Sequence, residues 1–394
     1  MKFELNIFVI GLILFLQSCS VGNVSPQGEA LETIVYDVDA VGKEVDITSL
    51  IDTSYYEMIR LETDDRCLIG EVSRIWLQQD KLFVYDRLSK GVFVFNKDGS
   101  YHSRVLAVGQ GPSEYPPVVN DVFVSDGFIY LLTPVVGKIY VYDWDGTFVK
   151  TIDLNGSWGE AMFSFDGERF CLLNAWGRSE IGAYHAYILE SKTSQVQPLG
   201  AFNPEYLEDN RGWGLDDYYS LAGDRALFLI PTCDTIYELD RHYDYHPRYA
   251  IDIVKKRLPR NLAEGDAHIA LQRSIADVYI IGVNKVLDAP KVLLLLMSDL
   301  KVIAYDKQEK KLFGAGENLK ITPFAFRFNF PQSWGDTDVL LYPMTADDIQ
   351  LRKTWVDELV FENKSFERDY KNMLNAVESE QENPVVFLFK WKKS

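Results

Sequence analysis

The chain repeats itself at a fixed interval, and this constrains its fold more than any other feature. The stretch LFVYDRLSKGVFVFNKDGSYHSRV begins at Leu82 and aligns without a gap, at an offset of 47 residues, with IYLLTPVVGKIYVYDWDGTFVKTI, which begins at Ile129. After a further 97 residues, about two repeat lengths, LFLIPTCDTIYELD (227–240) aligns with part of the second copy. Self-similarity of this kind is typical of folds that are built from like units.

Further copies extend the repeat to six units. The interval between those copies holds FDGERFCLLNAWG (165–177) and YHAYILE (184–190), which fit one more unit with a longer loop. A looser fifth copy lies around 290–306, and a sixth lies around 338–344 together with NPVVFLFKW near the end of the chain. Six units of unequal length therefore account for most of the sequence.

Each unit is predicted to consist of short strands joined by tight turns. Asp98-Gly99 and Asp145-Gly146 separate alternating apolar runs, and Asp-Gly is favoured in two-residue hairpin turns, which require positive φ. Repeats of roughly 40 to 50 residues with four strands are typical of propeller blades. The sequence thus predicts an all-β fold, a six-bladed β-propeller over residues 31–394. Short helical excursions are expected near 266–278 and over 365–377, the latter capped by Ser365.

The N-terminus predicts export and lipidation. Lys2 is followed by an apolar run over residues 7–16, which has the length of a signal-peptide core and is too short to span a bilayer. The LQSC that follows resembles a bacterial lipobox, so residues 1–18 are predicted to be a lipoprotein signal peptide, Cys19 the acylated first residue and 19–30 a tether. A buried cysteine after an ordinary signal peptide, or an N-terminal anchor helix, stays open as an alternative.

The charge of the chain argues against two classes of partner. Its 40 basic and 58 acidic residues give a formal net charge of −18. Such a chain repels a nucleic-acid backbone and an anionic membrane surface. We therefore expect no nucleic acid as partner, and membrane contact through the lipid anchor only.

The stretch VGQGPSEYPP (108–117) poses the question whether its glycines form a phosphate-binding loop. Such a loop needs a helix after the glycines, because the helix N-terminus supplies the free N–H groups that bind the anion. Here Gly111 is followed directly by Pro112, and an alternating, strand-like run comes next. The pattern favours a structural loop.

Several of these features together resemble one family. The lipobox, LIGEVSRIWLQQDKLFVYD, GQGPSEY, DTIYEL and NPVVFLFKW are similar to the six-bladed β-propeller lipoproteins of Bacteroidetes, which are related to NHL-repeat propellers. The resemblance extends over essentially the whole mature chain. It implies the propeller fold and a place in the cell envelope, in a membrane leaflet that stays open, and it implies that Gly109, Gly111 and Pro112 shape a turn between blades. It implies no particular activity.

Tryptophans followed by glycine mark a candidate binding site. Four such pairs, at Trp158, Trp176, Trp213 and Trp334, lie in predicted loops beside polar residues. Flat apolar rings next to hydrogen-bonding groups suit a sugar ring, but loop tryptophans can equally seal the gap between blades. Ring closure would bring the loops of three units onto one face. The predicted ligand-binding residues are Trp176, Arg178, Trp213, Asp216, Trp334 and Asp336.

Two classes of function stay open. The leading hypothesis is a non-enzymatic, lipid-anchored propeller that binds a glycan, a peptide or an envelope protein through loops on one face. The alternative is a lyase or hydrolase at the mouth of the central channel, where Asp216, Asp217, Asp336 and Asp338 could converge as general acid and base. No catalytic residue, metal ion or cofactor is predicted. Convergent, mutually hydrogen-bonded titratable side chains in a central pocket would favour the enzyme.

Overall fold

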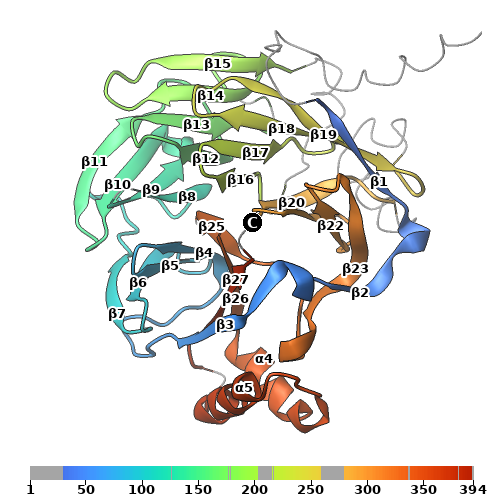
Figure 1. Cartoon of the computed structure of the whole chain (residues 1–394). Coiled ribbons are helices and arrows are strands. Elements are labelled where there is room, and N and C mark those ends of the chain that lie inside the picture. The colour runs from blue at the N-terminus through green and yellow to red at the C-terminus, as the bar shows by residue number, and fades with distance from the viewer. Residues whose placement is uncertain are drawn as a thin grey trace, which may run out of the picture.

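The computed structural model describes residues 30–125, 127–175, 177, 179–202, 215, 217–258, 279–335, 338–379 and 381–392, with 333–335 as backbone only. The strands form six sheets, and Figure 1 shows these sheets around a common centre. The predicted six-bladed β-propeller is therefore confirmed. Over these ranges, no helix is long and apolar enough to cross a membrane.

The first three blades are four-stranded antiparallel meanders, in which the strands follow one another in chain order. The aligned copies that begin at Leu82 and Ile129 cover the second, third and fourth strands of blades 1 and 2, as the repeat predicts. The strands are β4 (Val72–Gln78), β5 (Lys81–Asp86), β6 (Gly91–Asn96) and β7 (Tyr101–Val105) in blade 1; β8 (Asp121–Ser125), β9 (Phe128–Thr133), β10 (Lys138–Asp143) and β11 (Phe148–Asp153) in blade 2; and β12 (Ala161–Ser164), β13 (Arg169–Leu173), β14 (Tyr184–Glu190) and β15 (Val196–Ala201) in blade 3.

Blades 4 and 5 follow the same plan, and blade 6 takes only two strands from the C-terminal part of the chain. The later, looser copies of the repeat also fall on strands. The strands are β16 (Tyr219–Ala222), β17 (Arg225–Leu229), β18 (Thr235–Asp240) and β19 (Tyr245–Ile253) in blade 4; β20 (Val283–Asp288), β21 (Val292–Met297), β22 (Val302–Asp306) and β23 (Lys311–Ile321), with β24 (Phe326–Phe328), in blade 5; and β26 (Val339–Met344) and β27 (Val385–Trp391) in blade 6.

The N-terminal strands run along the outside of three blades and help to close the ring, which the repeat did not predict. Strand β1 (Glu32–Tyr36) pairs in parallel with β19, and β2 (Gly42–Asp46) pairs in parallel with β23. Strand β3 (Ile51–Arg60) is the third strand of blade 6, antiparallel to β27. Strand β25 (Ser333–Gly335) returns to blade 1 and lies parallel to β4. The ring is thus closed in its last blade by the start of the chain and in its first blade by a late strand.

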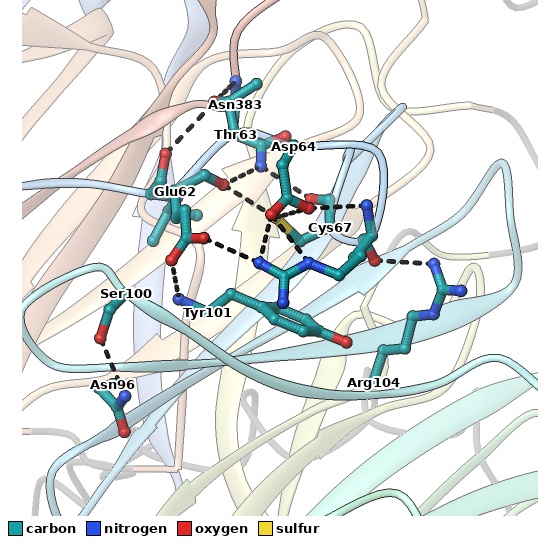
Figure 2. A network of polar contacts seen from close by, with 11 residues as sticks. Glu62, Thr63, Asp64, Cys67, Asn96, Ser100, Tyr101, Arg104 and Asn383 are labelled. Atoms are coloured by element: carbon teal, nitrogen blue, oxygen red, sulfur yellow. Dashed lines mark hydrogen bonds and ion pairs between the residues drawn. The ribbon is translucent and has the colours of Figure 1, made fainter.

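A buried asparagine fixes the segment between β3 and β4. Asn383, only 1% exposed, precedes β27, and its amide contacts the backbone of this segment (Figure 2). Its Oδ1 accepts from Ile69 N at 2.8 Å, and its Nδ2 donates to the carbonyl oxygens of Glu62 at 2.6 Å and Cys67 at 2.8 Å. Its own N–H donates to Thr63 Oγ1 at 3.0 Å. One side chain therefore joins the last blade to the entry of the first.

Two α-helices, α4 (Ala346–Lys353) and α5 (Lys364–Ala376), lie between β26 and β27 and lie outside blade 6 in Figure 1. Helix α5 confirms the predicted helix, but its cap is Asn363, whose side chain accepts from Phe366 N, and not Ser365, which already lies inside the first turn. Helix α4 was not predicted, because only two of its eight residues are buried.

The predicted helix at 266–278 lies outside the described residues. Short 3-10 turns are Val38–Ala40, Thr48–Leu50, Pro134–Val136, Thr322–Phe324 and Val356–Glu358.

The Asp-Gly hairpins have the predicted positive φ at glycine but a different turn. Gly99 has φ of 89°, and its N–H donates to Asn96 O at 2.9 Å, while Asn96 N donates to Ser100 O at 2.8 Å. The loop is therefore a three-residue turn that ends in a glycine bulge, in which only glycine needs positive φ. Gly146 repeats the arrangement with φ of 83°. The predicted two-residue turn was wrong, because the bulge adds one residue to the strand.

Aromatic rings pack between neighbouring blades and extend the core around the ring. Their centroids lie 4.8 to 5.0 Å apart, within the range of favourable aromatic pairs. These contacts fix the distance between neighbouring blades, so that the innermost strand of each blade lies next to the axis. The pairs are Phe83 with Trp144, Tyr130 with Phe170, and Phe163 with Tyr219.

Candidate functional site

A pocket of about 430 Å³ lies where the innermost strands of the ring begin. The starts of β4, β8 and β20 contribute to it, together with the segment before β16 and the turn between β5 and β6. Since these three strands and the segment before β16 belong to four different blades, they can meet only at the axis. The lining residues are Glu71, Val72, Ser73, Arg74, Tyr85, Arg87, Lys90, Val119, Asn120, Asp121, Leu215, Asp217, Lys285 and Gln332.

A chain of ion pairs crosses the floor of this pocket. The Arg74 guanidinium of blade 1 forms ion pairs with Asp121 of blade 2 and, at 3.3 Å, with Asp217 at the start of blade 4. The other oxygen of Asp217 lies 3.4 Å from Nζ of Lys285 in blade 5. Arg74, Asp121 and Asp217 are each less than 10% exposed. Burial makes these charges interdependent, because an unpaired charge is costly away from water.

Asp121 extends this chain to a further blade. It is fully buried, and its Oδ1 accepts from Val122 N at 2.8 Å while its Oδ2 accepts from Met162 N in β12 at 2.6 Å. Five of the six blades are therefore linked through four charged side chains at the axis. Both oxygens of Asp121 already accept hydrogen bonds from the backbone, so this carboxylate holds the strands at the floor of the pocket in place.

The rim of the pocket is organised by Asp86 at the end of β5. Its carboxylate accepts from Gly70 N at 3.2 Å and Glu71 N at 2.8 Å, and also from Leu88 N at 3.0 Å. These bonds fix the β5–β6 turn against the segment that enters β4. Arg87 in this turn lies 2.7 Å from Glu71, so one cation of the rim is already paired.

The loop that contains Gly109 and Gly111 supports the rim of the pocket, and it binds the carboxylate of its own residue Glu114. Gly111 N donates to the Glu114 carboxylate at 2.7 Å, and a Cβ at Gly109 would collide with that carboxylate. Tyr115, fully buried, donates from its hydroxyl to Lys90 O at 2.8 Å and thereby fixes the turn that carries Lys90 into the pocket. The loop leads into β8 without a helix, as predicted, so the motif is structural.

The electrostatics of the pocket contrast with those of the whole chain. Its lining includes the four cations Arg74, Arg87, Lys90 and Lys285 against the three carboxylates Glu71, Asp121 and Asp217, whereas the chain carries −18. Burial raises the pKa of Tyr85 to about 12, so its phenol stays protonated and can donate a hydrogen bond. A small net positive pocket with neutral donors suits an anionic group better than a neutral one.

The predicted site residues are not placed by this structure. Trp176, Arg178, Trp213, Asp216 and Asp336 lie outside the described residues, as does Cys19. Trp334 was predicted in a loop, but its backbone, the only part described, lies in strand β25 beside Trp76 of β4.

Two residues noted in the sequence can be placed. Asp217, one of the carboxylates expected to converge, does line the central pocket, whereas Asp338 is not among the lining residues. Trp158, another tryptophan followed by glycine, is half-buried and donates from its indole N–H to Glu160 at 2.7 Å.

The sequence analysis missed Arg74, Asp121 and Lys285, although one signal pointed to the first two. The repeat offset of 47 residues places Arg74 on Asp121, so one position of the repeat carries opposite charges in neighbouring units. Each charge also stands in or beside a strand of apolar residues, where charges are rare unless they are paired. Lys285 has no such counterpart in the aligned copies.

One solved structure supports the fold. A crystal structure of a candidate exported protein from Bacteroides fragilis superposes with a TM-score of 0.72 at 17% identity, covering 92% of this chain and 100% of that one. A DUF4221 family member from Bacteroides vulgatus gives a TM-score of 0.45 at 12% identity, over 86% of this chain and 97% of that one. No curated protein matches the sequence. The family model described as Domain of unknown function (DUF4934) matches residues 33–390, so the chain belongs to that family.

Proposed function

We propose that the protein is a binding protein of the cell envelope that takes an anionic group, such as the carboxylate of an acidic sugar or side chain, into the pocket at the axis. The observation that carries the proposal is the net positive lining at the convergent starts of four innermost strands, in a chain of charge −18. An anion that approaches this chain is repelled everywhere except where cations are concentrated. Arg74, Arg87 and Lys285 all face carboxylates, but the contact of Lys285 with Asp217 is the longest of these, at 3.4 Å. We therefore assign Lys90 and Lys285 to the ligand.

A titration with matched small molecules tests this proposal. Glucuronate and N-acetylglutamate should bind, while glucose and N-acetylglutamine, which lack the charge, should not. Lys90→Gln and Lys285→Gln should each weaken binding about tenfold, as expected for one lost charge-assisted contact. Lys192→Gln, in the β14–β15 turn at the other end of the ring, is the control. Equal affinity for charged and uncharged compounds, or unchanged affinity in both pocket variants, would contradict the proposal.

An enzyme is the second candidate, and one observation favours it. Asp217 contacts both Arg74 and Lys285 in the central pocket, and such convergence of titratable side chains is the pattern expected for a lyase or hydrolase site. Each oxygen of Asp217 faces a cation, however, which weakens it as a base, and Asp121 is occupied by backbone donors. Product formation from an envelope polysaccharide by the wild type, lost in Asp217→Asn, would establish the enzyme instead.

The lipid anchor is part of the proposal and is supported by LQSC after the apolar run of residues 7–16. A fatty-acid label should tag the wild type and not Cys19→Ala. Equal labelling of the two would exclude acylation at Cys19.

The contacts of Trp176, Trp213 and Trp334 with a ligand stay predictions. Their replacement by Ala in the titrations with glucuronate and N-acetylglutamate shows whether these side chains contribute to binding of the pocket ligand.

A further inference from the structure

We infer that the end of the ring that holds the pocket docks another protein, which inserts an acidic side chain into the pocket and covers the rim with apolar surface. This deepens the proposed function and rests on it. Of the three ligand classes expected from the sequence, a glycan, a peptide or a protein, it selects the protein. We call this end the pocket face; it comprises the turns between the second and third strands of the blades and the connections between blades.

The turns of the pocket face carry exposed aliphatic side chains in blade after blade. Leu88 in the β5–β6 turn is 69% exposed, Val135 in the β9–β10 turn 61% and Leu300 in the β21–β22 turn 63%. Ile181, between β13 and β14, is exposed as well. Such turns normally carry polar residues, because large apolar groups there lose the free energy gained by burial.

The connections between blades add to the same face. Leu106, Val108 and Val118 are exposed between β7 and β8, and Val254 is exposed just after β19. Val118 directly precedes two lining residues of the pocket, and Leu88 directly follows Arg87. The apolar residues thus begin at the rim of the pocket and extend outward over several blades.

The opposite face of the ring is different. In the described part of the chain, the turns there between first and second strands, and between third and fourth strands, carry no exposed large apolar residue, but Val149, Leu312 and Phe313 are exposed at the starts of the fourth strands β11 and β23. Leu351 and Val360 are exposed between β26 and β27. That connection leaves from the pocket end, because Gln332 N donates to Leu341 O and β26 is thus antiparallel to β25. The exposed residues of the opposite turns include Asp80, Asp98, Asp145, Glu168, Lys192 and Glu309. The turns at the opposite end thus carry mainly charged residues, and the pocket opens at the end whose turns carry exposed aliphatic residues.

The chemistry of the pocket face fits a protein better than a glycan or a membrane. The aliphatic side chains offer neither the flat rings nor the hydrogen bonds that sugars use. The net charge of −18 opposes approach to an anionic membrane. A protein interface, by contrast, combines a desolvated apolar area with a few charged anchors. Lys90 and Lys285 line the pocket, so a protruding Asp or Glu side chain of the partner would complement their charge.

Site-specific photo-crosslinking in the cells that produce the full chain tests the inference. A benzophenone amino acid replaces Leu88 or Leu300 on the pocket face, and Val149, exposed at the start of β11 at the opposite end of the ring, serves as the matched control. We expect the same protein, identified by mass spectrometry, in adducts from positions 88 and 300 and not from 149. The purified partner should then bind the wild type at least tenfold more tightly than the Leu88→Ser/Leu300→Ser variant or Lys285→Gln. Val149→Ser/Leu312→Ser, at the opposite end of the ring, should bind like the wild type.

The outcomes separate this inference from the proposed function. Binding of glucuronate or N-acetylglutamate in the pocket, with no protein adduct from positions 88 and 300, would overturn the docking face and leave the pocket proposal intact. A partner whose affinity is unchanged by Lys285→Gln would contradict the insertion of an acidic group. Adducts with a second copy of this chain, or binding to phosphatidylglycerol vesicles that is lost in Leu88→Ser/Leu300→Ser, would replace the inferred partner by another occupant.

Discussion

At the scale of single residues, the burial of His185 makes stability depend on pH. This side chain in β14 is 4% exposed and packs against Phe202 with ring centroids 4.4 Å apart, and its Nδ1 has no hydrogen-bond partner among the described residues. Burial lowers the pKa of His185 from 6.5 to about 4. The unfolded chain therefore binds a proton at this residue between these two pH values while the folded chain does not.

We predict that stability falls as the pH falls from 6.5 towards 4, by up to about 3 kcal/mol from this residue. His185→Phe keeps an aromatic ring in the site and removes the titration. Urea unfolding at a series of pH values should show a smaller acid loss for this variant than for the wild type. His242→Gln, an exposed histidine, should keep the loss. An identical pH dependence of wild type and His185→Phe would contradict the assignment.

Gly146 combines two constraints that can be measured separately. Its φ of 83° is unfavourable for other residues, and a Cβ there would collide with the carbonyl oxygen of Arg104 in blade 1. We predict that Gly146→Val destabilises the fold by about 1 to 3 kcal/mol through backbone strain, and further through the collision. Gly137→Val is the control, because Gly137 has φ of 66° and open space around it. Equal losses in thermal unfolding would mean that the contact between blades contributes nothing.

At the scale of elements, the repeat predicted the strands inside each blade well and the strands between blades not at all. Alternating apolar runs and glycine turns are local signals, so β5 to β7 and β9 to β11 follow directly from the aligned copies. Strands β1, β2 and β25 pair in parallel with partners far away in sequence, and no local turn marks such a pairing. The sequence analysis therefore assigned no strand to these segments and placed Trp334 of β25 in a loop.

The hydrogen bonds of Asn383 also act at the scale of elements, since they join the residue before β27 to the segment that enters β4 (Figure 2). We predict that Asn383→Leu costs about 3 kcal/mol or more, because it leaves Ile69 N and two carbonyl oxygens buried without their partner. Asn329→Leu is the matched control: Asn329 also donates to two carbonyl oxygens but at the surface, where water can replace it. Chemical unfolding measures the free energy of unfolding of both variants, and we expect the larger loss for Asn383→Leu. Equal losses would mean that the buried hydrogen bonds of Asn383 do not stabilise the contact between the two blades.

At the scale of the whole molecule, the candidate site could not be predicted from the sequence as a set. Its residues run from Glu71 to Gln332, and only closure of the ring brings them together. The opposite charges at Arg74 and Asp121 in aligned positions are a usable signal, because two neighbouring blades place equivalent residues close to each other at the axis. Nothing in the repeat connects Lys285 or Asp217 to that pair. Of the four charges that meet at the axis, the sequence analysis named Asp217 alone.

The chain of ion pairs across the axis leads to a prediction for the ring as a unit. Arg74→Met removes the cation that the buried Asp121 faces, whereas Asp217 keeps Lys285. We expect a loss of about 3 to 5 kcal/mol, as for other buried pairs that lose one partner. Since the charges link five blades, unfolding should stay a single transition at lower denaturant concentration.

Arg74→Met/Asp121→Asn separates the charge from the packing. It keeps the space filled and removes the uncompensated carboxylate, so it should recover at least about 1 kcal/mol relative to Arg74→Met. Urea unfolding followed by tryptophan fluorescence measures both variants, and Arg74→Lys serves if Arg74→Met does not fold. If Arg74→Met is as stable as the wild type, the chain of charges does not hold the blades together. Arg74 would then be retained for what enters the pocket, and its loss should appear in the glucuronate titration instead of in the unfolding curve.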